Sequence, residues 1–154
     1  MALSDDMAEL LSLFEKHEVE YVLVGGYAVN YYGYIRSTQD IDLLVNPSIE
    51  NAEKLMIALD DFGFGEAGIP RSYFEKPGSA IHLGNEPNRI DLLTKLKGIS
   101  NDQIFANKKR VQFDSIAVDI IDYQDLIQAK RLSDRLRDQA DADELEKTDR
   151  HSSE

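Results

Sequence analysis

The sequence predicts a small α/β domain of the α+β type, in which helices pack mainly on one face of a mixed β-sheet. Helical and strand patterns alternate in the first half of the chain, and strand patterns dominate much of the second half. The chain has 154 residues, of which 42% are hydrophobic and 30% charged, the balance of a soluble globular protein with its own core. We therefore expect one domain over residues 1–145 and a disordered polar tail over residues 146–154, which lacks apolar periodicity.

Apolar spacing and turn residues delimit the elements of the first half. Ser4 and the two acids after it can cap the first helix. Gly25-Gly26 ends the first apolar strand, Gly33 stops the second helix, and Pro47 follows the second strand. The expected elements are a helix over about Asp5–His17, a strand over Tyr21–Val24, a helix over Tyr27–Tyr32, a strand over Asp40–Val45 and a helix over Ile49–Phe62.

The second half of the chain indicates a long loop followed by hairpins and helices. Residues 63–78 hold four glycines and two prolines and predict a loop, with a weak strand at its centre as an option. Turn residues at 85–88 and at 114–115 predict two hairpins. The expected elements are strands over Ala80–Gly84 and Arg89–Thr94, a helical turn over Asp102–Ala106, strands over Val111–Phe113 and Ile116–Ile121, a helix over Tyr123–Leu132 capped by Asp122, and a polar helix over Asp134–Leu145.

The formal net charge of −12 at pH 7 limits the partners that the surface can attract. A surface this acidic repels a phosphate backbone and disfavours tight non-specific nucleic-acid binding, but it does not oppose a nucleotide held through metal ions. Cysteine is absent, and no apolar run approaches the roughly 18 residues of a membrane span. The N-terminus lacks the features of a signal peptide, so we expect a cytoplasmic protein with no membrane partner.

Asp40 and Asp42 stand in a strand that otherwise reads as buried. Because side chains alternate between the faces of a strand, both carboxylates project to one side, where like charges repel unless a cation lies between them. Magnesium is a hard ion that takes oxygen ligands, so this pair can hold it. On its own, however, an Asp-x-Asp pattern is more often a strand end with two solvated acids.

Two further features favour a metal site at that pair. Gly25-Gly26 lies between a strand and a helix, where glycine lets the backbone approach a phosphate and the helix start offers N–H groups to an anion. Asp91 is a lone acid in another apolar strand, and it joins the pair if the two strands are neighbours. Together these features predict a triphosphate on the glycines and its metal ions on three converging carboxylates.

The joined motif resembles the signature of the nucleotidyltransferase superfamily related to DNA polymerase β. An apolar residue precedes Gly25-Gly26, thirteen residues follow, and Asp40-Ile41-Asp42-Leu43 completes the pattern. The stretch from Arg36 to Asp42 looks like the form found in small prokaryotic members, including minimal nucleotidyltransferases and the toxin-like AbiEii group.

The C-terminal part of the chain is similar to the same group. Lys130, Arg135, Asp138 and Asp141 resemble its Lys…Arg-x-Lys-Asp-x-x-Asp helix, and Arg137 stands where lysine is usual. The resemblance covers roughly residues 21–145 and implies the nucleotidyltransferase fold.

The resemblance also implies a reaction and its cofactor. An acceptor group, usually a hydroxyl, attacks the α-phosphorus of a nucleoside triphosphate such as ATP, pyrophosphate leaves, and a nucleoside monophosphate is transferred. By motif position, Asp40 and Asp42 would bind both of two magnesium or manganese ions. Asp91 would bind the ion on the acceptor side and is the candidate for taking the acceptor proton.

Four residues are the implied contacts of the nucleotide. Gly25 and Gly26 would cradle the β- and γ-phosphates. Lys130 would balance the charge of the triphosphate. Arg36 is equally consistent with a triphosphate contact and with an ion pair to a carboxylate.

Other side chains fit structural roles better. Tyrosines at i, i+4 and i+7 could stack on a base, but such a stripe is more often core. His82 has no second His or Cys at metal-ligand spacing, so we interpret it as structural. Like Arg36, Arg89 is equally consistent with a phosphate contact and with an ion pair to a carboxylate. The tyrosines of the stripe are Tyr27, Tyr31 and Tyr34.

Two charged runs are typical of solvated surface. The run Lys108–Arg110 favours a solvated turn, although an RNA acceptor could dock there. A group of acids near the C-terminus lies at helical spacing with Arg135 and Arg137, which favours salt-bridged solvated faces over a metal site. These acids are Asp134, Asp138, Asp141, Asp143 and Glu144.

Three classes of function are consistent with the sequence. The leading hypothesis is a magnesium-dependent nucleotidyltransferase whose acceptor is tRNA, a protein or a small hydroxylated compound. The alternative is a non-catalytic protein of the same fold that binds or regulates a partner protein, as in a toxin–antitoxin pair, and the presence of all three acids favours catalysis over it. The third class is an unrelated α/β domain, which a missing cleft would support.

Overall fold

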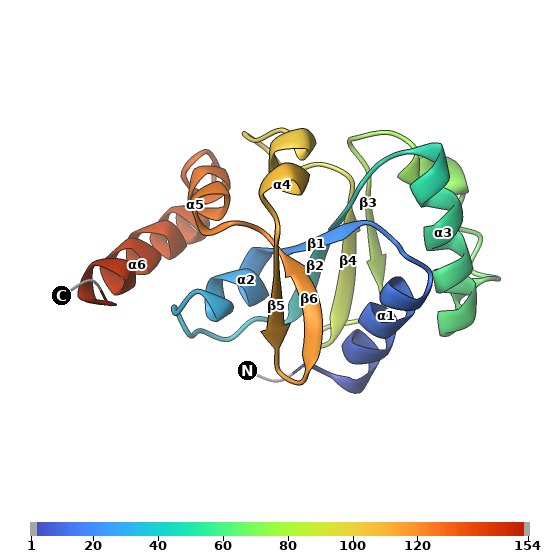
Figure 1. The fold of residues 1–154 in the computed structure, drawn as a ribbon, viewed down its shortest axis with the longest axis horizontal. Coiled ribbons are helices and arrows are strands. Elements are labelled where there is room, and N and C mark those ends of the chain that lie inside the picture. The colour runs from blue at the N-terminus through green and yellow to red at the C-terminus, as the bar shows by residue number, and fades with distance from the viewer. Residues whose placement is uncertain (1–2, 153–154) are drawn as a thin grey trace.

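The structure, a computed structural model, describes residues 3–152, with the side chains of residues 3–149. It confirms the predicted α/β class with a mixed sheet of six strands in the order β3-β4-β2-β1-β6-β5 (Figure 1). The strands are β1 (Tyr21–Val24), β2 (Asp40–Val45), β3 (Ala80–Leu83), β4 (Arg89–Leu93), β5 (Lys109–Phe113) and β6 (Ile116–Ile120).

Strand pairing brings the three predicted strands β1, β2 and β4 side by side. β2 pairs antiparallel with β1 and parallel with β4, so it lies in the middle of the sheet. β3–β4 and β5–β6 are the two predicted antiparallel hairpins, and β6 joins the sheet parallel to β1. The parallel register sets Asp42 directly beside Asp91.

The described residues form six α-helices around this sheet. Ser4 caps the first helix by accepting the Met7 N–H at 3.2 Å, and Asp122 caps the fifth by accepting the Gln124 N–H at 3.1 Å. In Figure 1, α1 and α3 lie at one end of the molecule and α5 and α6 at the other. The helices are α1 (Asp5–Lys16), α2 (Gly25–Tyr31), α3 (Ile49–Leu59), α4 (Asn101–Asn107), α5 (Tyr123–Arg131) and α6 (Leu136–Ser152).

Several boundaries differ from the prediction, and three of these differences change the description of the fold. α2 begins at Gly25, because the glycine pair forms the first turn of the helix instead of a turn before it. The loop over residues 63–78 holds no strand, and a short 3-10 turn, Arg71–Phe74, anchors it through the buried ring of Phe74. α6 runs on to Ser152, so the expected tail is helical from 146 to 152, and residues 153–154 lie outside the described residues.

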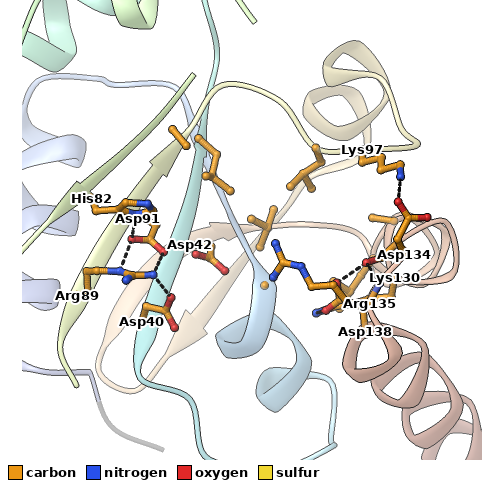
Figure 2. A pocket seen from close by; sticks show the side chains of 18 residues that line it. Asp40, Asp42, His82, Arg89, Asp91, Lys97, Lys130, Asp134, Arg135 and Asp138 are labelled. Atoms are coloured by element: carbon orange, nitrogen blue, oxygen red, sulfur yellow. Dashed lines mark hydrogen bonds and ion pairs between the residues drawn. The ribbon is translucent and has the colours of Figure 1, made fainter. Parts of the chain in front are cut away.

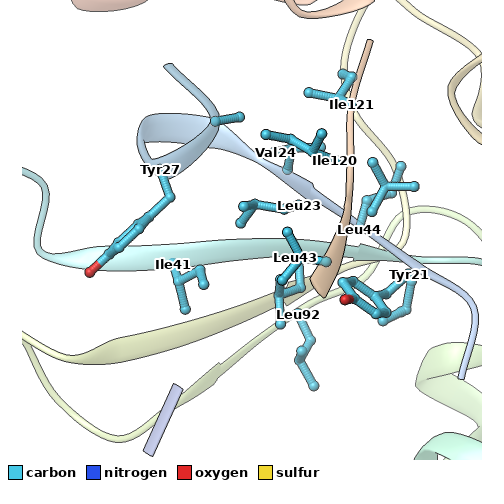
Figure 3. Close-up of a cluster of buried hydrophobic side chains, with 14 of the residues drawn as sticks. Tyr21, Leu23, Val24, Tyr27, Ile41, Leu43, Leu44, Leu92, Ile120 and Ile121 are labelled. Atoms are coloured by element: carbon cyan, nitrogen blue, oxygen red, sulfur yellow. The ribbon is translucent and has the colours of Figure 1, made fainter. Parts of the chain in front are cut away.

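The core covers both faces of the sheet, and one part of it fills the face opposite the carboxylates. Figure 3 shows Leu23, Ile41, Leu43 and Leu92 among the buried side chains of this cluster. Phe14 of α1 packs on Tyr21 with ring centroids 5.5 Å apart. Because side chains alternate along β2 and β4, the carboxylates lie on the opposite face, where Leu44 is also part of the core. None of the helices between residues 3 and 152 is long and apolar enough to cross a membrane.

Candidate active site

A cavity of about 480 Å³ opens on the carboxylate-bearing side of the sheet. Figure 2 shows its two walls, with Asp40, Asp42 and Asp91 from the strands on one side and residues of α5, α6 and their connection on the other. A missing cleft would have supported the third class of function, an unrelated α/β domain. The cavity lies at the predicted motif, so that class loses this support.

The three predicted carboxylates converge in this cavity. Asp40 and Asp42 project from the same side of β2, and Asp91 lies opposite Asp42 in the register of β2 and β4. Each of the three offers a carboxylate oxygen, and these atoms lie within 4.8 Å of one another. Clustered oxygen ligands of this kind suit a hard divalent cation.

Arg89 and His82 hold the most buried member of this group. The side chain of Asp91 is 6% exposed, and its Oδ1 accepts the Nε–H of Arg89 at 2.8 Å. The Nη2 of Arg89 donates to Asp40 Oδ2 at 2.8 Å, so the guanidinium bridges two of the three acids. The sequence left two roles open for Arg89, and in the structure Arg89 forms ion pairs with carboxylates.

The contact of His82 with Asp91 is a feature that sequence reasoning missed. His82 Nδ1 lies 2.6 Å from Asp91 Oδ1, and the His82 side chain, 55% exposed, lines the cavity. The two residues are register partners in the β3–β4 hairpin. The predicted hairpin turn at 85–88 carried that signal, because it fixes which residues face each other.

The electrostatics of the three acids are uneven. Burial, followed by the charges of Asp91 and Asp40, raises the pKa of Asp42 to about 7. Burial and the neighbouring Asp91 also raise the pKa of Asp40, although Arg89 opposes this. Burial alone would raise the pKa of Asp91, but hydrogen bonds from Arg89 and His82 outweigh it and lower that pKa. The group as a whole therefore lacks positive charge, and the deficit is largest at Asp42.

The glycine pair has two different environments. Gly25 lines the cavity with φ +70°, and a Cβ there would lie 2.2 Å from Asp42 Oδ2, so only glycine fits. Gly26 faces away from the cavity, and a Cβ there would lie 2.8 Å from Thr38 Oγ1 and 3.4 Å from Arg36 Nη1.

Lys130 lines the wall opposite the three acids, whereas Arg36 does not line the cavity. Arg36 donates Nε–H and Nη2–H to the two oxygens of Asp141, each at 2.8 Å. Lys130 Nζ donates to Asp138 Oδ1 at 2.8 Å and to Asp141 Oδ2 at 3.1 Å. Of its two open roles, Arg36 therefore has the ion pair with a carboxylate.

A model of a protein family described as "Nucleotidyl transferase of unknown function (DUF2204)" matches residues 3–153. The chain belongs to this family. The match confirms the predicted enzyme class, a nucleotidyltransferase.

A solved structure supports the same fold. The crystal structure of the lincosamide antibiotic adenylyltransferase LnuA with lincomycin bound aligns with this chain at a TM-score of 0.54 and 15% sequence identity. The alignment covers 95% of this chain and 98% of that chain. At this identity the likeness shows a shared nucleotidyltransferase fold. No curated protein matches the chain.

Two surface predictions for this nucleotidyl transferase need correction. The C-terminal acids are not all solvated, because Asp141 is 1% exposed and binds Arg36 and Lys130. The run Lys108–Arg110 lies in and beside β5 rather than in a turn. Its charges form four ion pairs with three acids, which lessens its value as a dock for RNA. The pairs are Lys108–Asp119, Lys109–Asp122, Arg110–Asp119 and Arg110–Glu15.

The tyrosine stripe lies away from the cavity. Tyr27 is buried against Phe113, with ring centroids 6.0 Å apart, as the core interpretation predicts. Tyr31 is more exposed and stacks on Phe113 on the surface of the same region. None of the three tyrosines is among the residues that line the cavity, so base stacking by this stripe has no support within the described residues.

Proposed function

We propose that this nucleotidyl transferase moves a nucleoside monophosphate from a nucleoside triphosphate to a hydroxyl of a small compound, with two magnesium or manganese ions held by Asp40, Asp42 and Asp91. The observation that carries the proposal is the convergence of three carboxylates on one wall of a cavity. The donor set fits the ions: the ligands are oxygens, and a bound cation would relieve the repulsion that, after burial, raises the pKa of Asp42 beside Asp91 and Asp40. When bound, the ions would supply positive charge to the α-phosphate and to the leaving pyrophosphate.

The proposed step forms one bond and breaks one. The acceptor oxygen bonds to the α-phosphorus, the bond from that phosphorus to the bridging oxygen of the β-phosphate breaks, and pyrophosphate leaves. Asp91 takes the hydroxyl proton. Hydrogen bonds from Arg89 and His82 keep its carboxylate ionised, so it is able to accept this proton, but they also make it a weaker base than a free carboxylate.

The protein's other contribution is to position the triphosphate. Gly25 leaves the cavity floor beside Asp42 free of a side chain, so that phosphates can lie against the backbone. Lys130 offers an ammonium group on the opposite wall and offsets phosphate charge. We propose that Gly26 and Arg36 support this phosphate site from behind, because neither lines the cavity.

The surroundings of Asp91 favour a small acceptor over a macromolecule. Ala80, Leu93 and Leu96 give an apolar wall on that side of the cavity. The basic run at β5 lies at the other edge of the sheet from β4, and its ion-paired charges leave it little free basic surface for tRNA. A protein acceptor, a partner protein and a toxin–antitoxin role remain alternatives that the same experiment addresses.

The experiment uses purified protein and each of the four triphosphates labelled at the α-phosphate, with magnesium or manganese. Acceptors are supplied as a small-molecule extract, as tRNA and as a protein fraction, and released pyrophosphate is measured in parallel. We expect label in the small-molecule fraction, and none with Asp42→Asn. Triphosphate binding without any labelled acceptor would instead support the non-catalytic alternative, and label in tRNA or protein would overturn the small acceptor.

A further inference from the structure

We propose that Asp141 is a positioning residue that sets the affinity for the triphosphate by holding Lys130 against the cavity and tying it, through Arg36, to the glycine turn of α2. The inference rests on the proposed function, and it replaces the direct triphosphate contact predicted for Arg36. Asp141 does not line the cavity, so any effect it has on a ligand must pass through its partners.

The first link joins Asp141 to Lys130. Three donated hydrogen bonds converge on the Asp141 carboxylate, two from the guanidinium of Arg36 and one from the ammonium of Lys130. The Lys130 side chain is only 10% exposed, and its second bond goes to Asp138 at the cavity wall. An ammonium fixed by two carboxylates loses less side-chain entropy on meeting a phosphate than a freely moving lysine does.

The second link joins Arg36 to the glycine turn. The backbone N–H of Arg36 donates to Asn30 Oδ1 of α2 at 3.0 Å, and its Nη1 donates to the Ser37 carbonyl at 3.0 Å. The same Nη1 lies 3.4 Å from the place where a Cβ of Gly26 would be. The guanidinium thus lies between the first turn of α2 and the Asp141 carboxylate on α6.

The cost of burying the charges of Arg36, Asp141 and Lys130 indicates that their network has a role beyond stability. Burying charged groups carries a desolvation penalty, and apolar replacements of buried ion pairs are often as stable or more so. Burial raises the pKa of Asp141, yet bonds from Arg36 and Lys130 outweigh it and lower the pKa. The network lies between the two sides of the proposed phosphate site, because Lys130 lines one wall and Arg36 lies beside the turn of α2 that carries Gly25 and Gly26.

A double-mutant cycle tests whether Arg36 acts through Asp141. Binding of a non-reactive α,β-methylene triphosphate with magnesium is measured by calorimetry for Arg36→Met, for Asp141→Asn and for the double variant. We expect each single change to weaken binding about 10-fold or more, the scale of losing a charged hydrogen bond, and the double variant to bind no more weakly than Asp141→Asn. Additive losses would show that Arg36 contacts the triphosphate directly and would overturn the proposal.

Asp143→Asn is the matched control. Asp143 lies on the same helix and pairs with Arg131 at 2.7 Å, but it does not line the cavity or touch Lys130. We expect its affinity to equal that of wild type, and Asp141→Glu to recover part of the loss. An equal loss in Asp143→Asn would make the effect a general property of α6. If Asp141→Asn does not fold, Arg36→Lys takes its place. This change keeps the positive charge but removes the guanidinium that donates to both oxygens of Asp141.

A second readout needs no nucleotide. The rate at which an amine-reactive reagent labels Lys130 is compared in wild type, Asp141→Asn and Asp143→Asn, well below their melting temperatures. We expect faster labelling in Asp141→Asn alone, and labelling at the wild-type rate would overturn the positioning of Lys130. If wild type binds no triphosphate, the proposed function and the effect of Asp141 on affinity are both wrong. The labelling rates test separately whether Asp141 positions Lys130.

Discussion

Two clusters of carboxylates lie at opposite walls of the cavity, and their pKa values shift in different directions. The sheet cluster, Asp40, Asp42 and Asp91, has Arg89 and His82 as its basic partners, and the pKa of Asp42 rises to about 7. In the helix cluster, Asp138 and Asp141, burial is outweighed by hydrogen bonds from basic side chains, and both pKa values fall.

The contrast separates a candidate ion site from an ion-pair network. Each cluster contains one closely spaced pair of aspartates in the sequence, and strand pairing adds Asp91 to the sheet cluster. Their partners make the difference, because Lys130 and Arg36 compensate the helix cluster, whereas Asp42 receives no hydrogen bond from a basic side chain among those described. We therefore expect a divalent cation to act on the sheet cluster and not on the helix cluster.

The largest expected effect is the loss of transfer when the sheet cluster loses a ligand. Asp42→Ala or Asp40→Ala should lower the rate of pyrophosphate release by about 1,000-fold or more, because the charge developing on the phosphates is no longer offset. Circular dichroism should show a retained fold. Asp143→Ala is the control on α6, and activity of Asp42→Ala close to that control would remove the sheet cluster from catalysis.

Asp91→Asn should distinguish the acceptor side of the sheet cluster from its triphosphate side. We expect single-turnover transfer to slow by about 100-fold, the scale of a lost positioned base or charge stabiliser, with a smaller loss of triphosphate affinity. Transfer at the wild-type rate would show that Asp91 is misassigned. The third acid would then have to be sought elsewhere, although Asp119 and Asp122 do not line the cavity and pair with basic side chains at β5.

Gly25→Ala should disturb the sheet cluster through Asp42. Gly25 and Gly63 both have positive φ, so alanine at either position should lower stability by about 1–2 kcal/mol. Only at Gly25 would the new Cβ meet a carboxylate, since nothing lies within 4 Å at Gly63. We expect Gly25→Ala alone to lower the transfer rate, by about 10-fold or more. Equal rates for the two variants would contradict a role for the space beside Asp42.

The pH dependence of stability should differ in sign between Asp42 and the helix cluster when no divalent ion is present. The folded state holds the Asp42 proton more tightly than the unfolded state does, so this contribution to stability is present at low pH and lost as the pH rises from about 4 to about 7. The lowered pKa values of Asp138 and Asp141 act oppositely, with stability lost as the pH falls below about 4.

Urea unfolding across this range should separate the two contributions. Asp42→Asn should flatten the decline between about pH 4 and pH 7, and Asp141→Asn should leave that decline in place. A wild-type decline that Asp42→Asn does not change would mean that another group titrates in this window.

The sheet cluster was predictable from the sequence because its geometry is local. A period of two along β2 places Asp40 and Asp42 on one face, and the recognised motif supplies the partner strand with Asp91. The strand bounds of β1 and β2 agree with the prediction for the same reason, since apolar runs and turn residues define them.

The helix cluster was not predictable in the same way. Arg36 and Asp141 are 105 residues apart, and no local pattern indicates which distant cation a helical acid meets. Helical spacing suggested pairs with Arg135 and Arg137 on a solvated face, but tertiary packing buried Asp141 instead. The polar sequence after Leu145 has no apolar stripe, so its helical continuation to Ser152 also lacked a signal.

Manganese binding tests most directly whether the sheet cluster holds divalent ions and the helix cluster does not. Mn²⁺ is titrated into wild type, Asp42→Asn and Asp138→Asn without nucleotide, and free Mn²⁺ is measured by its electron paramagnetic resonance signal. We predict that wild type and Asp138→Asn bind with similar affinity and that Asp42→Asn binds at least about 10-fold more weakly. Equal binding by Asp42→Asn and wild type, or no wild-type binding at about millimolar Mn²⁺, would contradict the account.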